Sequence, residues 1–516
     1  MKAVVLIPPV YDFYFTPHRS AGLGAEILCK LLQAKGWQTR LLNFPLESKK
    51  GVNQDLPSAL GYLKPYLMEG ETGQLSFFTR YQRFGPAPED CVRQVLADAP
   101  DLILISCFAF CYASAAVDLA AKLRKADPRP VIACGGAGVS AHPEYFIRHP
   151  AVDYAFTGEA EVFLPDFLET IASGSRDFSR IANLFWKNSD GLITAPSGTR
   201  QTLPGEIAFT LKKTMETTAA VYFSTTLSRG CPKKCRFCSN FISHGRQFRT
   251  IPPATIEATL AGMKIARETR GKPVYINFED DNFLCDPAYF FSVLDRFRAV
   301  FPEAGFLAEN GIDYTLITPD LLDRLIRSGF RQFNLSMVST DEKLLDRENR
   351  SASRQLYETI TATLKRNNLP CITYFICGLK NDTREKVAAT LAYLAGQETR
   401  VGISLFYPVP GIPDYQDKSF FDGIDPCRCA GSSAYPWNGS LTTRELVTAF
   451  RLSRLVNLMK SERRTDADRT LIAKSIRERR LYTESRNRGG REIVPVPDMD
   501  EELLDLFFGK LQSGAV

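Results

Sequence analysis

The sequence lacks a long apolar run, a strong net charge and a leader-like start, and each absence excludes a class of protein. No uninterrupted apolar run reaches the ~18 residues of a membrane-spanning helix. The net charge of +6 over 516 residues is small, so it requires neither nucleic acid nor a membrane as partner. The start MKAVVLIPP breaks its apolar run with two prolines, unlike a signal peptide. We therefore expect a cytoplasmic protein with no membrane span and no nucleic-acid partner, whose 13 cysteines stay reduced.

A fourth cysteine is missing from the most informative segment of the chain. Cys231, Cys235 and Cys238 stand in the stretch SRGCPKKCRFC, spaced C-x3-C-x2-C, and the next cysteine, Cys285, is far along the sequence. Three thiolates in one loop can hold three irons of a [4Fe–4S] cluster and leave the fourth iron open for a ligand. The alternative is structural zinc, which needs four ligands, and His244 is the only nearby histidine. The spacing favours a catalytic cluster.

This cysteine spacing, with Phe237 directly before the last cysteine, resembles the radical S-adenosylmethionine (radical SAM) family. The resemblance implies that the amine and carboxylate of SAM bind the open iron. One electron from the cluster would then cleave SAM to methionine and a 5′-deoxyadenosyl radical. A reducing partner such as flavodoxin or ferredoxin is implied as well.

Residues 1–175 alternate strand and helix patterns. Apolar strands between amphipathic helices predict an α/β domain with a doubly wound parallel sheet, in which ligands bind at the carboxyl ends of the strands. The predicted strands are 3–7, 38–42, 101–106, 130–136 and 154–156, and the candidate binding residues at their ends are Pro8, Pro9, Ser106, Gly135, Gly136, Gly158 and Glu159.

The order and spacing of these pieces resemble the cobalamin-binding domain that precedes the radical SAM domain in one large subclass. The resemblance implies cobalamin as a cofactor. An Asp-x-His-x-x-Gly motif, whose histidine ligates cobalt from below in many cobalamin proteins, is missing. Bound cobalamin would therefore have its lower face held without a histidine. The alternative is a domain that has kept the fold and lost the cofactor.

Two segments do not follow the sheet pattern. Residues 46–90 form an insertion that either caps the cofactor or substrate channel or makes a surface helical excursion. Residues 176–219 are mixed and polar, and we expect a linker with a small hairpin there.

From residue 220 to 421 the strand–helix alternation resumes. Six predicted strands fit the partial (β/α)6 barrel of radical SAM enzymes, whose site forms at the carboxyl ends of the strands. By resemblance, Glu279 and Asp280 would hold the methionine amine, because a carboxylate suits an ammonium group. Asn310 and Ser336 would bind the SAM carboxylate or ribose, and Phe237 would pack on adenine.

The barrel also departs from its relatives. They often carry Gly-x-Glu-Ser after the fourth strand, where this chain has Val338 in place of the glutamate. Arg347 and Arg350 either supply a charged contact nearby or are solvated helix charges.

Residues 422–516 are expected to be mostly helical, with an amphipathic helix over 443–459. Cys427 and Cys429 form a C-x-C pair that alone is a weak signal for a metal or substrate contact. The basic stretch 463–491 is interleaved with acids, which is typical of a solvated face; an anion site is the other possibility.

We therefore predict a radical SAM enzyme that methylates an unactivated carbon of a small-molecule or natural-product intermediate, with cobalamin delivering the methyl group. The first alternative is a radical cyclase, oxidoreductase or rearrangement enzyme without methyl transfer. The second is a cofactor-binding sensor or partner subunit without turnover, against which the intact cysteine loop argues. The aromatic content permits a large apolar substrate without requiring one.

Overall fold

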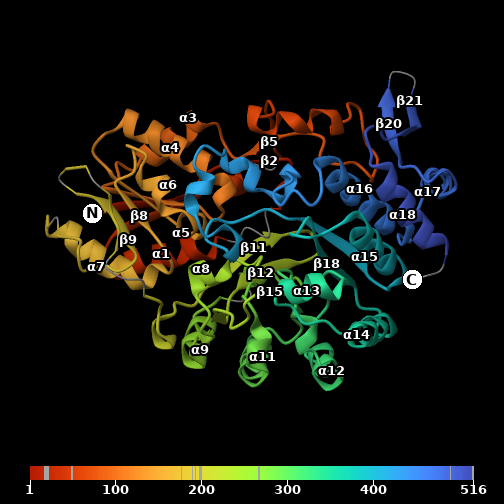
Figure 1. The fold of residues 1–516 in the computed structure, drawn as a ribbon. Coiled ribbons are helices and arrows are strands. Elements are labelled where there is room, and N and C mark those ends of the chain that lie inside the picture. Colours follow the sequence, from red (N-terminus) through yellow and green to blue (C-terminus); the bar gives the residue numbers. More distant parts are fainter. Residues whose placement is uncertain are drawn as a thin grey trace.

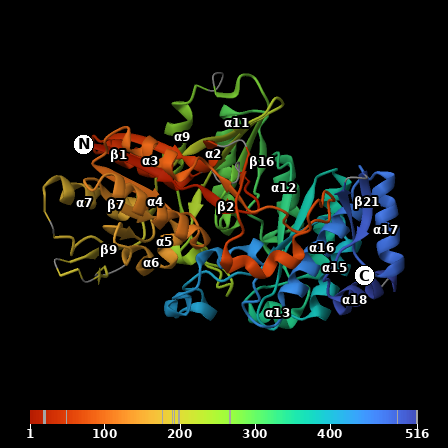
Figure 2. The same ribbon diagram turned by 90° about the horizontal axis from the view of Figure 1, so that it is seen from above.

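The computed structural model describes residues 1–16, 22–47, 50–175, 177–188, 190–191, 193–196, 200–264, 268–487 and 490–513. Figure 1 shows an N-terminal α/β domain, a half-open barrel whose helices fan outward, and a helical C-terminal region beside the last barrel strands. Seen from above, the N-terminal domain and the C-terminal region lie at opposite ends of the molecule (Figure 2). No helix among the described residues combines the length and apolarity needed to cross a bilayer.

The N-terminal domain has a sheet of order β10-β9-β8-β7-β6-β1-β3, in which β3, β1, β6, β7 and β8 are parallel. Alternate residues of β1 face opposite cores: Val4 and Leu6 pack with the side of α3 and α4, and Val5 and Ile7 with the side of α1 and α7. Helices on both faces confirm the doubly wound prediction. The bounds are β1 Lys2–Ile7, β3 Gln38–Asn43, β6 Leu102–Ser106, β7 Val131–Gly135, β8 Tyr154–Phe156, α1 Leu23–Ala34, α3 Pro88–Leu96, α4 Ala113–Ala126, α5 Ala137–Ala141, α6 Pro143–Ile147 and α7 Ala160–Ala172.

The segment expected to be a linker takes part in both sheets. Its hairpin, β9 (Leu184–Lys187) and β10 (Ile193–Thr194), pairs antiparallel with β8 and extends the first sheet. Its last strand, β11 (Leu211–Glu216), pairs antiparallel with β12 of the barrel. The connection is therefore held at both ends by backbone hydrogen bonds.

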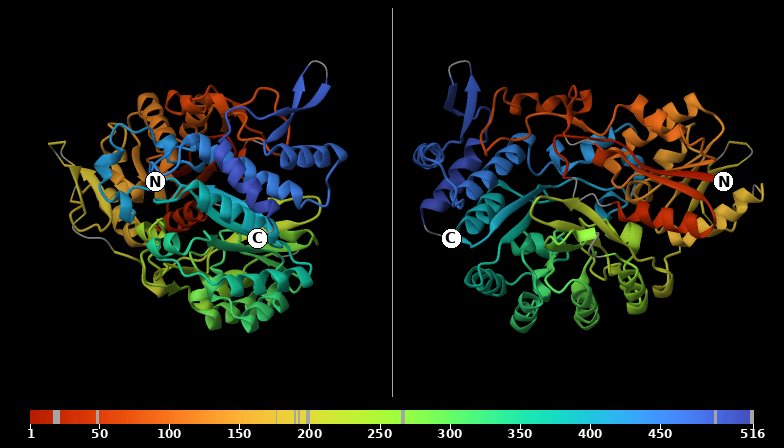
Figure 3. Two further views of the ribbon diagram at one scale, coloured as in Figure 1. Left: turned by 45° about the vertical axis from the view of Figure 1, so that its right-hand side comes forward. Right: turned by 180° about the vertical axis from the view of Figure 1, so that it is seen from behind.

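The barrel consists of six strands in two hydrogen-bonded groups, β12-β15-β16 and β17-β18-β19, all parallel within each group. Parallel bridges Phe306–Phe330 and Ile312–Leu335 close the gap between them. The helices cover the outer side, as both views of Figure 3 show. The bounds are β12 Val221–Thr225, β15 Val274–Phe278, β16 Gly305–Leu307, β17 Phe333–Val338, β18 Cys371–Cys377, β19 Arg400–Leu405, α9 Pro253–Ala261, α11 Pro287–Val300, α12 Pro319–Arg327, α13 Glu342–Arg347, α14 Arg354–Arg366 and α15 Arg384–Gly396.

The C-terminal region contains the helices α16 (Thr443–Met459), α17 (Asp466–Glu478) and α18 (Glu501–Gln512). The predicted helix over 443–459 is therefore confirmed. A Thr442–Glu445 capping box starts α16, because each side chain satisfies a backbone amide of the other. The hairpin of β20 (Tyr482–Asn487) and β21 (Gly490–Pro495) was not predicted.

Residues 50–87, here called the strap, pack along the C-terminal region. The strap holds β4 (Val52–Asn53), the 3-10 helix Ser58–Tyr66 and β5 (Gln82–Phe84), which pairs with β2 (Val10–Asp12). Its side chains Leu60, Leu63, Leu75 and Phe77 are at most 2% exposed and belong to the barrel core. The surface-excursion alternative is therefore wrong.

Candidate active site

The three predicted cluster cysteines lie in one loop between β13 (Ser228–Arg229) and α8 (Asn240–His244). The loop turns at Gly230, which has a φ of +82°. A Cβ there would lie 2.1 Å from the carbonyl oxygen of Gln247. Only glycine adopts this backbone without strain, so Gly230 fixes how the chain enters the cysteine loop.

The acidic turn after β15 holds this loop. The Asp280 carboxylate accepts the amide of Leu227 at 3.1 Å and the hydroxyl of Ser228 at 2.5 Å. Asp281 Oδ2 accepts the Gly230 amide at 2.8 Å. Each acid thus contacts the strand and turn that lead into the cluster cysteines.

The structure places Asp280 beneath the loop, away from the cofactor space. Asp280 is 5% exposed, and both of its carboxylate oxygens are hydrogen-bonded to the loop. This geometry differs from the expected contact with the methionine amine. It makes Asp280 a positioning residue, and burial raises the pKa of its carboxyl to about 7.

This raised pKa predicts a pH dependence of stability. An unfolded Asp ionises near pH 4, whereas folded Asp280 keeps its proton up to about pH 7. Its stabilising contribution is full below about pH 4 and is lost as pH rises to about 7. The unfolding free energy of the cluster-free protein, measured with urea, should decrease less steeply with rising pH across this window in Asp280→Asn than in wild type. The exposed Asp320→Asn should keep the wild-type slope; equal slopes in all three proteins would contradict the assignment.

Sequence reasoning missed that Cys285 lies beside the cysteine loop, although it is distant in sequence. The Cys285 thiol hydrogen-bonds Cys231 and, with the Lys233 amide and Asn282, lowers the pKa of Cys231 to about 6. Asn282 Nδ2 is 3.8 Å from the Cys231 sulfur. The expectation that no fourth cysteine is close is therefore wrong. Cys285 follows β15, and the carboxyl end of β15 lies beside the cysteine loop.

Arg350, for which the sequence left open a charged contact or a solvated helix charge, lies beside the cysteine loop. Its side chain is 7% exposed, and its Nη1 lies 3.9 Å from the Cys235 sulfur and 3.2 Å from Asp313 Oδ2. Asp313 also forms an ion pair with Lys233 of the loop. Burial raises the pKa of the Cys235 thiol, and the Arg350 charge opposes this shift, so Arg350 favours the thiolate that binds iron. The solvated-charge alternative is wrong for this residue.

Arg347 is likewise engaged. It forms ion pairs with Glu348 and, at 2.5 Å, with Asp414 of the proline-rich segment after β19. Asp414 also pairs with Arg236 of the cysteine loop. This network links the loop to the segment that follows the last barrel strand.

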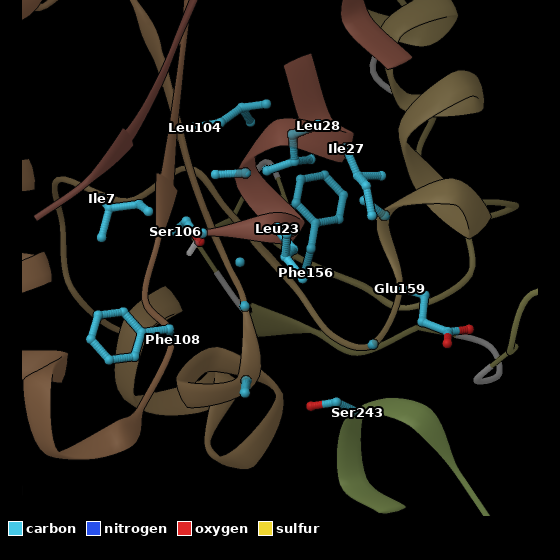
Figure 4. Close-up of a pocket in the computed structure, with 18 of the residues that line it drawn as sticks. Ile7, Leu23, Ile27, Leu28, Leu104, Ser106, Phe108, Phe156, Glu159 and Ser243 are labelled. Carbon is cyan, nitrogen blue, oxygen red and sulfur yellow. The ribbon is translucent and has the colours of Figure 1, made fainter. Parts of the chain in front are cut away.

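A cavity of about 450 Å³ opens between the two domains (Figure 4). Ser106, Gly135, Gly136, Gly158 and Glu159 line it at the strand ends of the first domain, as predicted from their positions in the sheet. Its opposite wall includes residues of α8 together with Glu279 and Asp281. Pro8 and Pro9 lie outside its lining, and Pro9 lines a second cavity.

At this cavity the Glu159 carboxylate is hydrogen-bonded to other residues of the protein. Its carboxylate accepts from Arg249 at 2.8 and 2.9 Å and from the amide and hydroxyl of Thr202. Arg229, just before the cysteine loop, bonds Glu161 at 2.8 Å. Although burial raises the pKa of Glu159, the Arg249 and Arg229 charges hold it at about 2. These pairs clamp the first domain to the barrel, so Glu159 is a positioning residue in this geometry.

The SAM-side candidates gather at the barrel mouth in two places. Asn310 Nδ2 donates to the carbonyl of Glu279 at 3.3 Å, so these two lie together beside the cavity. Ser336 instead accepts from Arg350 at its carbonyl. Phe237 packs against a small apolar cluster that includes Val338. Val338 has a φ of +75° at a bulge in β17, a strained conformation for a β-branched residue at the position that departs from the family pattern.

The residues around the cysteine loop and those lining the cavity fit the implied cofactors. Hydrogen-bond donors at Asn282 and Arg350 face the sulfurs of the loop and favour iron-bound thiolate. The inner end of the cavity is apolar, lined by Leu28, Leu104 and Phe156 among others, and suits a buried ring (Figure 4). The described part of the first domain brings no imidazole to this lining. His244 comes from the opposite wall, with its Nδ1 2.9 Å from Asp281.

The cysteine pair of the C-terminal region does not form one site. Cys427 lines the second cavity, whereas Cys429 is buried among side chains of the first domain. The thiols thus belong to different surroundings.

Comparisons with known proteins agree with this geometry. A model of the radical SAM superfamily matches residues 225–394, and a model of the B12 binding domain matches residues 78–168. Bacteriochlorophyllide d C-12(1)-methyltransferase from Chlorobaculum tepidum is 26% identical over 194 residues, 37% of this chain and 41% of that protein. Cytidylyl-2-hydroxyethylphosphonate methyltransferase from Streptomyces wedmorensis is 21% identical over 385 residues, 67% of this chain and 66% of that protein. The chain thus spans less than two thirds of the length of both.

The fold is also similar to a solved structure. TsrM from Kitasatospora setae, a radical SAM methyltransferase with cobalamin and a [4Fe–4S] cluster bound, superposes with a TM-score of 0.57 at 15% identity. The match covers 80% of this chain and 76% of that one. The two matched domains imply a [4Fe–4S] cluster, SAM and cobalamin as cofactors. The chain belongs to the radical SAM superfamily and carries a B12-binding domain ahead of its radical SAM domain.

Proposed function

We propose that this protein is a cobalamin-dependent radical SAM methyltransferase that methylates an unactivated carbon of a small-molecule or natural-product intermediate. The observation that carries the proposal is the shared cavity. Strand ends of the B12-binding domain form one wall, and Glu279, Asp281 and α8, next to the cluster cysteines, form the other. In this proposal the two cofactor sites open onto one space.

When bound, the cluster supplies the electron that cleaves SAM, and cobalamin supplies the methyl carrier. The chain's own residues bind and orient these groups. Cys231, Cys235 and Cys238 hold the cluster, and the Glu279 carboxylate with Asn310 binds the polar end of SAM. Ser106, Gly135, Gly136 and Gly158 bind cobalamin. The Glu159–Arg249 pair fixes the interface that shields the space from water.

The surroundings of the reaction follow from the same proposal. The protein works in the cytoplasm with a flavodoxin or ferredoxin as electron donor and a small molecule, not nucleic acid, as substrate. Reduced thiols and an oxygen-sensitive cluster need the same reducing compartment.

The proposal is tested by following SAM in the reconstituted enzyme with a reductant. Methylation of an unactivated carbon consumes two molecules of SAM: one gives up its methyl group and becomes S-adenosylhomocysteine, and the other is cleaved to methionine and, after hydrogen abstraction, 5′-deoxyadenosine. We therefore expect both products, with S-adenosylhomocysteine formed only when cobalamin is present. Formation of 5′-deoxyadenosine without S-adenosylhomocysteine, with or without cobalamin, would instead identify a radical cyclase, oxidoreductase or rearrangement enzyme.

A further inference from the structure

Arg454, on the inner face of α16, carries a guanidinium group with no acidic partner in the part of the chain that the structure describes. It is partly buried, and its Nε is shielded from solvent with no hydrogen bond. No hydrogen bond or ion pair joins Arg454 to any residue that the structure describes. The ring of Phe450 lies 4.7 Å from its guanidinium carbon. Buried charges in proteins are normally paired, so this guanidinium lacks the anionic partner that its burial calls for.

Glu71 of the strap, whose charge acts on Arg454, is already paired with Arg451. Arg451 Nη1 and Nη2 bond the two Glu71 oxygens at 2.6 and 3.1 Å, and this pair is 0% and 1% exposed. The one carboxylate is therefore taken by Arg451, and Arg454 has no ion pair with it. Burial and the charge of Arg451 lower the pKa of Arg454 from its usual value. The surroundings thus hold one positive charge in excess.

The Arg454 guanidinium lies beside a group of aromatic side chains at the mouth of the barrel. Tyr14 stacks on Phe78 with ring centroids 5.3 Å apart, and Phe78 lies 5.0 Å from Phe450. Tyr14 is 57% exposed, and Tyr407, which follows β19, is 41% exposed. Tyr14 also contributes to raising the pKa of Tyr407, which places the two near each other. Accessible surface therefore remains beside the carboxyl ends of the barrel strands, where barrel ligands bind.

We infer that Arg454 binds an anionic oxygen group, a carboxylate or a phosphate, of the substrate, while Tyr14, Phe78 and Phe450 cover the apolar part of the same molecule. A guanidinium forms paired hydrogen bonds with both kinds of oxyanion. The word substrate rests on the proposed function, but the anion site rests on Arg454 and its surroundings alone. The inference narrows the substrates to anionic molecules with an apolar or aromatic body.

The test measures binding of three probes to the reconstituted holoenzyme by calorimetry: phenylacetate, phenyl phosphate and the neutral phenylacetamide. At least one anion should bind about tenfold or more tightly than the amide, and the preferred anion tells carboxylate from phosphate. Arg454→Met should reduce anion binding to the level of the amide. Arg444→Met, an exposed arginine on the same helix, should bind as wild type does.

Stability separates a binding role from a structural one. Replacing an unpaired, partly buried charge by an apolar side chain should leave the melting temperature unchanged or raise it. If Arg454→Met does not fold, Arg454→Lys carries the test, with several-fold weaker anion binding because lysine lacks the planar fork. Equal binding of anions and amide to wild type, or anion binding that survives these substitutions, would overturn the inference. Methyl transfer is not a readout, so failure of the proposed function leaves this result intact.

Discussion

The Cys238→Ala variant loses SAM cleavage, with activity falling below about one-thousandth of wild type, because one iron of the cluster loses its ligand. Its iron content after reconstitution falls below that of wild type. The measurement is 5′-deoxyadenosine plus S-adenosylhomocysteine formed per chain, together with iron analysis. The loop offers no substitute, since Cys285 lies beside Cys231 and follows a different strand.

The matched control is Cys285→Ala. Cys285 hydrogen-bonds Cys231 but stands outside the C-x3-C-x2-C loop, so this variant should keep the iron content of wild type and retain turnover. A cluster closed by Cys285 as fourth ligand would give the opposite pattern. Loss of iron in Cys285→Ala, with Cys238→Ala still active, would contradict the claim that only the three loop cysteines hold the cluster.

The Glu71→Gln variant is expected to lose about 3–5 kcal/mol of unfolding free energy, because it leaves Arg451 as an uncompensated buried charge. Arg451 also donates hydrogen bonds to the Leu75 and Tyr66 carbonyls of the strap. The substitution therefore destabilises the contact between the strap and α16. Arg454 beside it adds like-charge repulsion. Urea unfolding of the full-length chain, with and without cluster, measures the change.

Two variants show whether the missing charge causes this loss. The double substitution Glu71→Leu with Arg451→Met removes both charges and should recover most of the stability, since an apolar pair of similar volume often replaces a buried ion pair without loss. Glu398→Gln breaks the exposed pair with Lys365 and should cost less than about 1 kcal/mol. A Glu71→Gln protein as stable as the Glu398→Gln protein would contradict the account of the strap.

The sequence predicted the framework well because the strands of both domains are apolar runs ended by glycine, proline or acids. The cysteine loop and the strand ends at Ser106, Gly135 and Gly158 follow directly from that pattern, and the structure places the strand ends along one cavity. The strap was ambiguous, because Leu60 and Phe77 are buried only by contact with distant segments. Periodicity within the strap does not reveal such contacts.

Roles of individual side chains were harder to predict than positions. Glu159 and Asp280 stand at strand ends, but the structure pairs them with Arg249 and with the Leu227 amide. Arg350 and Cys285 reach the cysteine loop only through the closure of the barrel. A signal was present in the run Glu279-Asp280-Asp281-Asn282, because four polar residues after one buried strand exceed what a helix cap needs.

The most direct test of the central claim is metal analysis of the protein purified without oxygen, reconstituted with iron and sulfide, loaded with hydroxocobalamin and desalted. The account predicts about one cobalt and about four irons per chain, with the visible spectrum of bound cobalamin. About four irons without cobalt would contradict it, and would leave a radical SAM enzyme whose first domain is only a scaffold.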